Sequence, residues 1–286
     1  MADPSDPTKL LDLEHILLVR WDDLVETRPK SEYPFKGPLP PFEPSDERPG
    51  YTVNEAVALY GGQARSPNPW TIECPVIGEY VGRLNDAMPD DARQRLILYI
   101  SQLSRSRSTP EVEAKRAYLA ADWAIRRIAA RQLRTEVLDL QEIERQRREV
   151  GAKSMAKWKL DSLVDDMLRR ASSLERIAPI TDKRTAGKAA KRANATEKAA
   201  FYAADDLGAG VSETLLYAKR AAETATKQEK SEWPQEVASW AAKVVEKEAH
   251  SHSRGFPDRH ADPHHIGDWN DSLDLLGALL RVGSRP

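Results

Sequence analysis

Asp122 and Arg126 are four residues apart in a segment whose apolar spacing predicts a helix, and a helical wheel places both on its apolar side. A carboxylate and a guanidinium at this spacing lie on the same helix face, where they can form an ion pair. Burying either charge alone costs several kcal/mol, so we expect the two to neutralise each other in the interior. Asn85, Asp86 and Arg93 on the preceding helices would extend the pair into a polar network.

Such a network has two interpretations. It can fix the register of the packed helices, or the Asp122 carboxylate can serve a ligand or a reaction. We favour the structural role, because no assembled catalytic motif accompanies these residues. On the same wheel a narrow arc of four arginines is predicted to face solvent; it comprises Arg116, Arg127, Arg131 and Arg134.

Residues 250–265 form a second candidate site, because five of the six histidines and two aspartates fall there. Imidazole and carboxylate groups are ligands of zinc and iron. The candidate ligands of a divalent metal are His250, His252, His260, His264 and His265. Their spacing matches no defined metal motif, with neither H-E-x-x-H nor a cysteine pair. The sequence therefore predicts a solvated loop and no cofactor, with a metal site as the alternative.

The charges of the chain nearly cancel, since 43 basic and 45 acidic residues leave a net charge of −2. This balance gives no general field that would attract nucleic acid. Local basic runs exist, as in 183–192, but acidic residues such as Glu142, Glu149 and Glu197 accompany them, which is typical of solvated helix surfaces. Nucleic acid is therefore not a predicted partner.

Cys74 is the only cysteine, so no intrachain disulfide can form, which indicates a reducing compartment. The first residues lack the basic start and apolar run of a secretory signal. The longest apolar patches are shorter than a membrane span of about 20 residues. We therefore expect a cytoplasmic protein with no membrane partner.

Periodicity and helix-breaking residues predict an all-α protein, a single bundle-like helical domain with a proline-rich extended N-terminal segment. Residues 1–72 would comprise a helix over 10–25 and the proline-rich segment, packed on a helical domain at 73–286. Within that domain, prolines, glycines and hydroxyl caps predict helices that end near Met88, begin at Pro110 and end before Pro179. Fourteen alanines in 183–227 predict two helices that approach closely.

Several segments resemble a set of alanine-rich helical bacterial proteins of unknown function. The resembling segments are 74–77, 84–94, 118–124, the alanine tract and 273–286. The resemblance implies one helical domain and a bacterial cytoplasmic origin. It implies no activity, so no residue inherits a role from it.

Three functions remain open. We expect first a non-enzymatic interaction or scaffolding protein that acts through protein–protein contacts, in a bacterial or phage-encoded assembly or as an immunity-like inhibitor. The second is a metal-dependent or ligand-binding enzyme that uses the histidine-rich loop, and the third is a nucleic-acid-binding protein. The partner's identity and homo-oligomer formation are left open.

Overall fold

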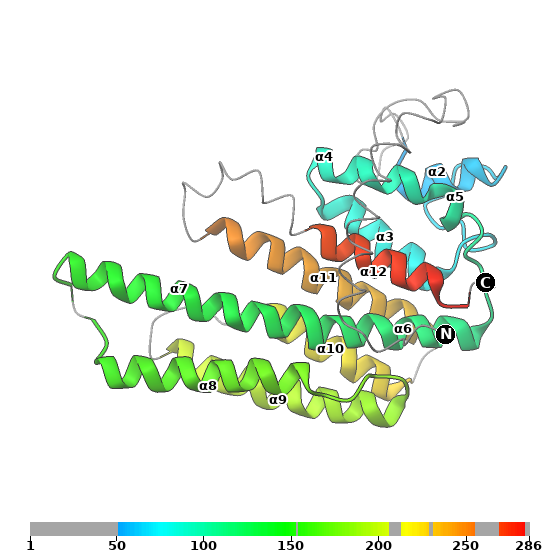
Figure 1. Cartoon of the computed structure of the whole chain (residues 1–286). Helices are drawn as coiled ribbons and strands as arrows, with labels where there is room; N and C mark the ends of the chain where they lie inside the picture. The colour runs from blue at the N-terminus through cyan, green and yellow to red at the C-terminus, as the bar shows by residue number, and fades with distance from the viewer. Residues whose placement is uncertain (1–50, 153, 206–212, 229–230, 255–268, 284–286) are drawn as a thin grey trace, which may run out of the picture. The chain divides into compact units, whose positions relative to one another are not determined.

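The computed structural model describes residues 51–283, apart from 153, 206–212, 229–230 and 255–268 (Figure 1). All of them belong to the second of two units, Gly37–Pro286. The described residues form helices and no strand, so the predicted all-α class is confirmed. The predicted helix over 10–25 and the proline-rich segment lie outside the described residues.

The elements have the following bounds, and η marks a 3-10 helix (η2) or a π-helix (η3). In chain order they are α2 Val53–Tyr60, α3 Pro75–Ala87, α4 Asp90–Arg93, η2 Gln94–Tyr99, α5 Ile100–Leu103, α6 Pro110–Trp123, η3 Ala124–Ala129, α7 Ala130–Glu149, α8 Lys157–Glu175, α9 Lys183–Asp205, α10 Glu213–Lys227, α11 Trp233–Arg254 and α12 Asn270–Arg281.

The first elements follow local signals in the sequence. Thr52 and Glu55 form a capping box, in which each side chain bonds the other's backbone N–H, and this starts α2. Pro75 opens α3, whose apolar face is fully buried and includes Ile77, Tyr80 and Leu84. The Tyr80 hydroxyl donates to the Ser272 carbonyl oxygen at 3.1 Å, so α3 is joined to α12 at the far end of the sequence.

Three elements run without a break from Pro110 to Glu149. We call these three contiguous elements the rod. The π-helical turn η3 lies in its middle and contacts α8, α10 and α11. A π-turn widens the helix and rotates every later residue relative to a regular wheel. A wheel drawn at 100° per residue therefore misplaces residues beyond Trp123.

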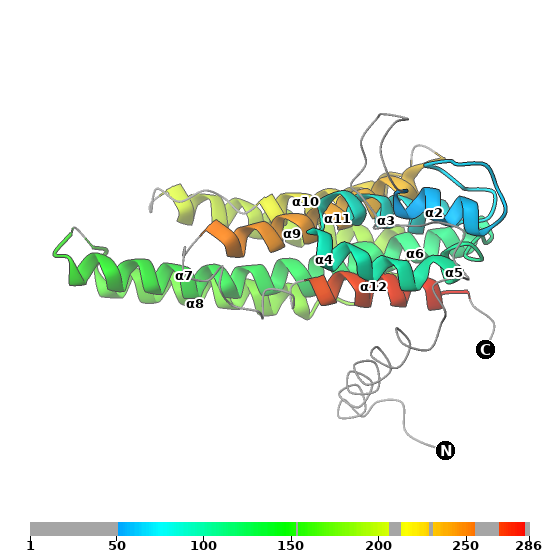
Figure 2. The ribbon, with the colours of Figure 1, turned by 90° about the horizontal axis from the view of Figure 1, so that it is seen from above.

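Small side chains let α9, α10 and α11 pack side by side, as Figure 2 shows. The alanines that face neighbouring helices are buried; they include Ala189 and Ala193 in α9, Ala221 and Ala222 in α10, and Ala241 in α11. The predicted close approach of the alanine-rich helices is confirmed, since Gly187 of α9 lies against Thr226 of α10.

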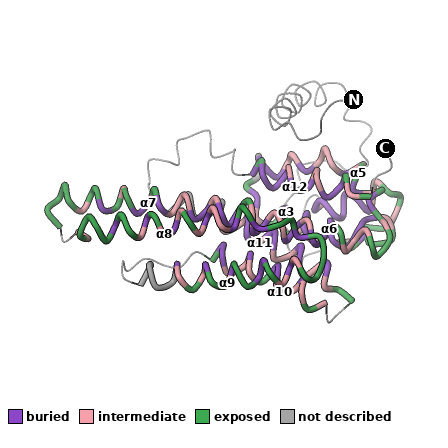
Figure 3. The backbone as a smooth tube through the Cα atoms, turned by 60° about the horizontal axis from the view of Figure 1, so that its bottom comes forward, coloured by how far each residue is buried: buried purple, intermediate pink, exposed green. Residues whose placement is uncertain are grey.

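Helices α7 and α8 form a hairpin joined near residues 150–156, and its distal half is largely exposed (Figure 3). The apolar stripe of α8, which includes Leu160, Val164 and Met167, is buried. Four of the five exposed large apolar side chains among the described residues lie in this hairpin or its turn: Leu138, Ile143, Val150 and Trp158.

Arg116 does not face solvent as the wheel predicts, because α12 covers it. It is 3 % exposed and donates to the carbonyl oxygens of Leu279, Val282 and Ser106 at 3.0, 3.0 and 2.7 Å. The last turn of a helix leaves carbonyl groups without intrahelical donors, and a guanidinium satisfies several of them at once. Arg116 thus fixes the C-terminal end of α12 against α6.

Candidate anion-binding groove

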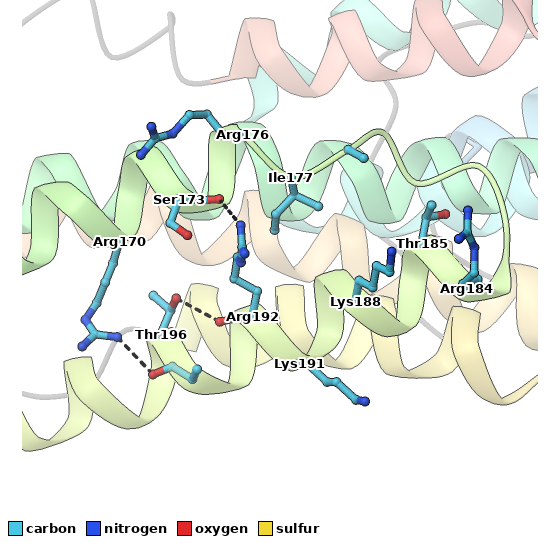
Figure 4. Close-up of a pocket in the computed structure, with 12 residues that line it drawn as sticks. Arg170, Ser173, Arg176, Ile177, Arg184, Thr185, Lys188, Lys191, Arg192 and Thr196 are labelled. Carbon is cyan, nitrogen blue, oxygen red and sulfur yellow. Dashed lines mark hydrogen bonds between the residues drawn. The ribbon is translucent and has the colours of Figure 1, made fainter.

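A groove of about 670 Å³ lies between α8 and α9 and continues along the segment that connects them (Figure 4). Six of its twelve lining residues are basic: Arg170, Arg176, Arg184, Lys188, Lys191 and Arg192. The other six are Ser173, Ile177, Ala178, Thr185, Ala195 and Thr196, so the lining contains no carboxylate, histidine, cysteine or aromatic side chain. Such a lining attracts anions.

The helical period gathers the cations of α9 on one face. Arg184, Lys188 and Lys191 follow one another at spacings of four and three residues, which places them on adjacent turns of that face. Glu197 lies on another face, where its carboxylate pairs with Lys219 of α10 at 2.5 Å. The acidic residue that balances this basic run in the sequence therefore does not reach the groove.

Few acceptor groups of the protein bind the cations that line the groove. Arg170 pairs with Asp166 at 2.6 Å, and Arg192 donates to the Ser173 carbonyl oxygen at 3.4 Å across the groove. Lys188 and Lys191 are both exposed, and among the described residues no carboxylate lies within ion-pair distance of either. Their charges are available to a ligand.

The connecting segment 176–182 is held in place at both ends. Asp182 immediately precedes α9, and its carboxylate accepts the Thr185 N–H at 2.7 Å. This backbone bond and a second from the Thr185 hydroxyl lower the pKa of Asp182. The positive end of the α9 dipole is thereby occupied, so anion binding here depends on the side chains.

Asp122 and Arg126 hold the other end of that segment. Their ion pair forms, with 3.0 Å between Arg126 Nη1 and Asp122 Oδ2. Asp122 Oδ1 also accepts the Ile180 N–H at 2.9 Å, and Arg126 Nε donates to the Glu175 carbonyl oxygen at 3.3 Å. The pair is half-buried at the edge of the helices rather than in the interior, and it joins the α8–α9 connection to the rod.

Asn85, Asp86 and Arg93 lie elsewhere: the first two belong to the end of α3 and Arg93 to the end of α4. Arg93 is buried and donates to the carbonyl oxygens of Asn85 and Met88, both at 2.5 Å. Asn85 Oδ1 accepts the Val53 N–H at 3.3 Å, and its amide donates to Asp86. The five residues of the predicted network thus divide into two clusters, neither of which lines the groove.

The histidine-rich loop is not tested by the structure. His260, His264 and His265 lie outside the described residues, and His250 and His252 fall in the last turns of α11, whose side chains are not described. Among the described side chains, no group of three His, Cys, Asp or Glu residues is placed to hold a metal ion.

A cluster of acids and arginines, absent from the sequence prediction, joins the rod to α11 and α12. Arg131 makes two hydrogen bonds to the buried Glu248 carboxylate, at 2.7 and 2.6 Å, and also contacts Asp271. Arg127 binds Asp271 at 2.7 Å and lies over the Trp123 ring at 4.5 Å. Arginines predicted to face solvent therefore neutralise carboxylates from distant helices.

The comparisons with known proteins give no family: no family model, no curated protein and no solved structure matches the chain. In the part of the chain that the structure describes, no helix combines the length and apolar character needed to cross a membrane.

Proposed function

We propose that the protein is a non-enzymatic binding protein whose α8–α9 groove binds the phosphate backbone of a nucleic acid strand. One observation carries the proposal: six basic side chains line a groove without a carboxylate, in a chain whose net charge is −2. The positive charge is concentrated in one place while the net charge of the chain is negative. This supports a local anion-binding site and not a general attraction of the whole protein to anions. This is the third of the functions that the sequence leaves open.

The arrangement of the cations favours a polymer over a single phosphate. Arg184 and Arg192 are eight residues apart on α9, so the basic face extends for about 12 Å at 1.5 Å per residue. A nucleic acid strand presents charges repeatedly along such a length, whereas one phosphate would use a single turn. Guanidinium and ammonium groups both bind phosphate oxygens.

The lining also indicates how far the groove could distinguish between the base sequences of nucleic acids. It holds no aromatic ring on which a base could stack and no asparagine or glutamine to bond a base edge. Contacts to phosphates position a protein on the strand but carry no sequence information. We therefore expect binding through this groove to depend on salt and to differ little between sequences.

The first prediction is measured by fluorescence anisotropy with labelled 20-nucleotide single strands and 20-base-pair duplexes over a range of salt concentrations. If all six cations contact phosphates, the plot of log affinity against log salt should have a slope of about −4 for single strands. The double variant Lys188→Glu, Lys191→Glu should weaken binding at least about ten-fold, because it replaces two attractions by repulsions.

A matched control keeps the net charge equal. Arg148 and Lys157 are exposed near the turn of the α7–α8 hairpin, outside the groove, and their reversal to glutamate should change affinity less than about three-fold. Equal loss in both double variants would show that only total charge matters. Absence of binding to either oligonucleotide at low salt would reject the proposal.

The protein-partner function stays a prediction, because the exposed apolar residues do not define one surface. Leu138 and Ile143 are five residues apart on α7, which places them about 140° apart around the helix. Trp158 is exposed on α8, on the side opposite its buried stripe. The groove is the described feature with a single coherent chemistry.

A further inference from the structure

An aromatic pair lies between α10 and α11. The rings of Tyr217 and Trp240 are stacked, with 5.7 Å between centroids and 16° between planes. Both side chains are half-buried, so part of each ring is accessible at the surface. The exposed part of an aromatic ring offers a flat apolar surface, which is the shape that a nucleobase covers when it stacks on a protein.

Two cations accompany the rings. Arg220 lies 5.0 Å from the Trp240 centroid and 5.9 Å from that of Tyr217, and Lys243 lies 4.8 and 5.7 Å from the same two. Among the described residues neither cation has a carboxylate within ion-pair distance, whereas nearby Lys219 and Lys247 are paired with Glu197 and Glu213. The rings, rather than acids, therefore hold Arg220 and Lys243 in place.

We propose that Tyr217, Trp240, Arg220 and Lys243 form a base-stacking platform, and that the ligand of the protein is single-stranded nucleic acid. This inference rests on the proposed phosphate-binding function. A base that stacks on the Trp240 ring replaces one cation over that ring, and the released cation then pairs with a phosphate of the same strand. The cation–π contact is thus exchanged for a charge-assisted hydrogen bond and a stacked base.

The platform and the groove lie on successive helices. Helix α9 has α8 on one side and α10 on the other, as the Arg192–Ser173 bond and the Glu197–Lys219 ion pair show. Packed helices are 8–10 Å apart, so a strand that leaves the groove crosses about two such spacings, ~20 Å, to reach the α10–α11 seam. A duplex keeps its bases paired inside, so only a single strand can use both features.

The test compares two strands with the same phosphates. A 20-nucleotide poly-dT and an abasic 20-mer are titrated against the full chain, and the wild type should bind poly-dT about ten-fold more tightly, since one stacked base contributes roughly that factor. Trp240→Leu and, separately, Tyr217→Leu should reduce the difference between the two strands to less than about two-fold. Trp70→Leu, in the loop between α2 and α3, is the control and should keep the full difference.

The outcomes distinguish failure of the platform from failure of both proposals. If the wild type binds poly-dT and the abasic strand equally, the platform is rejected while phosphate binding in the groove stands. If both Leu variants keep the full difference while their circular dichroism matches the wild type, the bases stack elsewhere and the platform is again rejected. If neither strand binds, both proposals fail.

Discussion

Glu73 is fully buried, and neither of its carboxylate oxygens has a hydrogen-bond partner among the described residues. Burial disfavours the charged form, so desolvation raises the pKa of Glu73 well above its usual value. The folded protein therefore keeps a proton on this group at pH values where the unfolded chain has lost it. Nothing in the residue types around Glu73 indicates this, because the burial comes from tertiary packing.

We predict that Glu73→Gln stabilises the protein increasingly as pH rises. Because the folded pKa lies above the unfolded one, wild-type stability is full below about pH 4.5 and falls by up to about 1.4 kcal/mol per pH unit until the folded pKa is reached. The variant has no such proton to bind. Urea unfolding at intervals between pH 4.5 and 8 should show free energies that diverge.

Glu111→Gln is a control for which the pH dependence of the unfolding free energy should have the opposite sign. A hydrogen bond with the Thr109 side chain lowers the pKa of this exposed carboxyl, so its contribution is present above its unfolded pKa and disappears in acid. Parallel stability curves for wild type and Glu73→Gln would show that Glu73 is ionised in the folded protein, contrary to our reading.

Helical elements were predictable where the sequence supplies its own boundaries. Pro110 acts within one turn, so its helix begins as expected, and the Thr52 cap and Pro75 start α2 and α3 in the same local way. The π-turn at Ala124–Ala129, which contacts α8, α10 and α11, was not predictable from the periodicity of this segment. Arg116 was misplaced because two of the three carbonyl groups that accept its hydrogen bonds come from residues more than 160 positions away.

The groove was only partly predictable. The basic run 183–192 is visible in the sequence, but so is Glu197, and periodicity alone does not say which faces are covered. Lys219 of α10 pairs with Glu197, so the carboxylate lies on the side of α9 that faces α10 and not on the side that faces α8. The cations from α8 could be assigned to the same site only after the hairpin arrangement was known.

We predict that the Asp122 carboxylate stabilises the segment that connects α8 and α9. In Asp122→Ala the Ile180 N–H, in a buried residue, loses its acceptor, which should cost about 1–2 kcal/mol of unfolding free energy. Hydrogen exchange should accelerate at Ile180 and its neighbours before the rest of the protein. Asp165→Ala, on the exposed face of α8, is the matched control. Unchanged exchange at Ile180 would mean that the carboxylate does not hold this segment.

At the scale of the molecule, the arginine–acid cluster joins three parts of the chain. Arg131 neutralises Glu248, which is 1 % exposed, and contacts Asp271 at the start of α12. Without the guanidinium the Glu248 carboxylate would lose this pair while it stays buried. The cluster therefore holds α11 and α12 against the rod.

We predict that Arg131→Met destabilises the protein by about 2 kcal/mol, less than for a fully buried pair because the guanidinium is partly exposed. The double variant Arg131→Met, Glu248→Met should recover part of this loss, since it removes the buried charge together with the guanidinium that pairs with it. Guanidinium chloride denaturation measures both. A double variant no more stable than the single one would show that the charge of Glu248 is not the source of the cost.

The guanidinium of Arg116 has a consequence for biosynthesis. Its acceptors include the carbonyl oxygens of Leu279 and Val282, so during translation this side chain emerges long before the residues that satisfy it. Until then the guanidinium must stay hydrated, so the face of α6 that carries Arg116 cannot be buried. Folding of this half of the protein should therefore be completed only after residues 270–282 have left the ribosome, even though most helices are formed by neighbours in sequence.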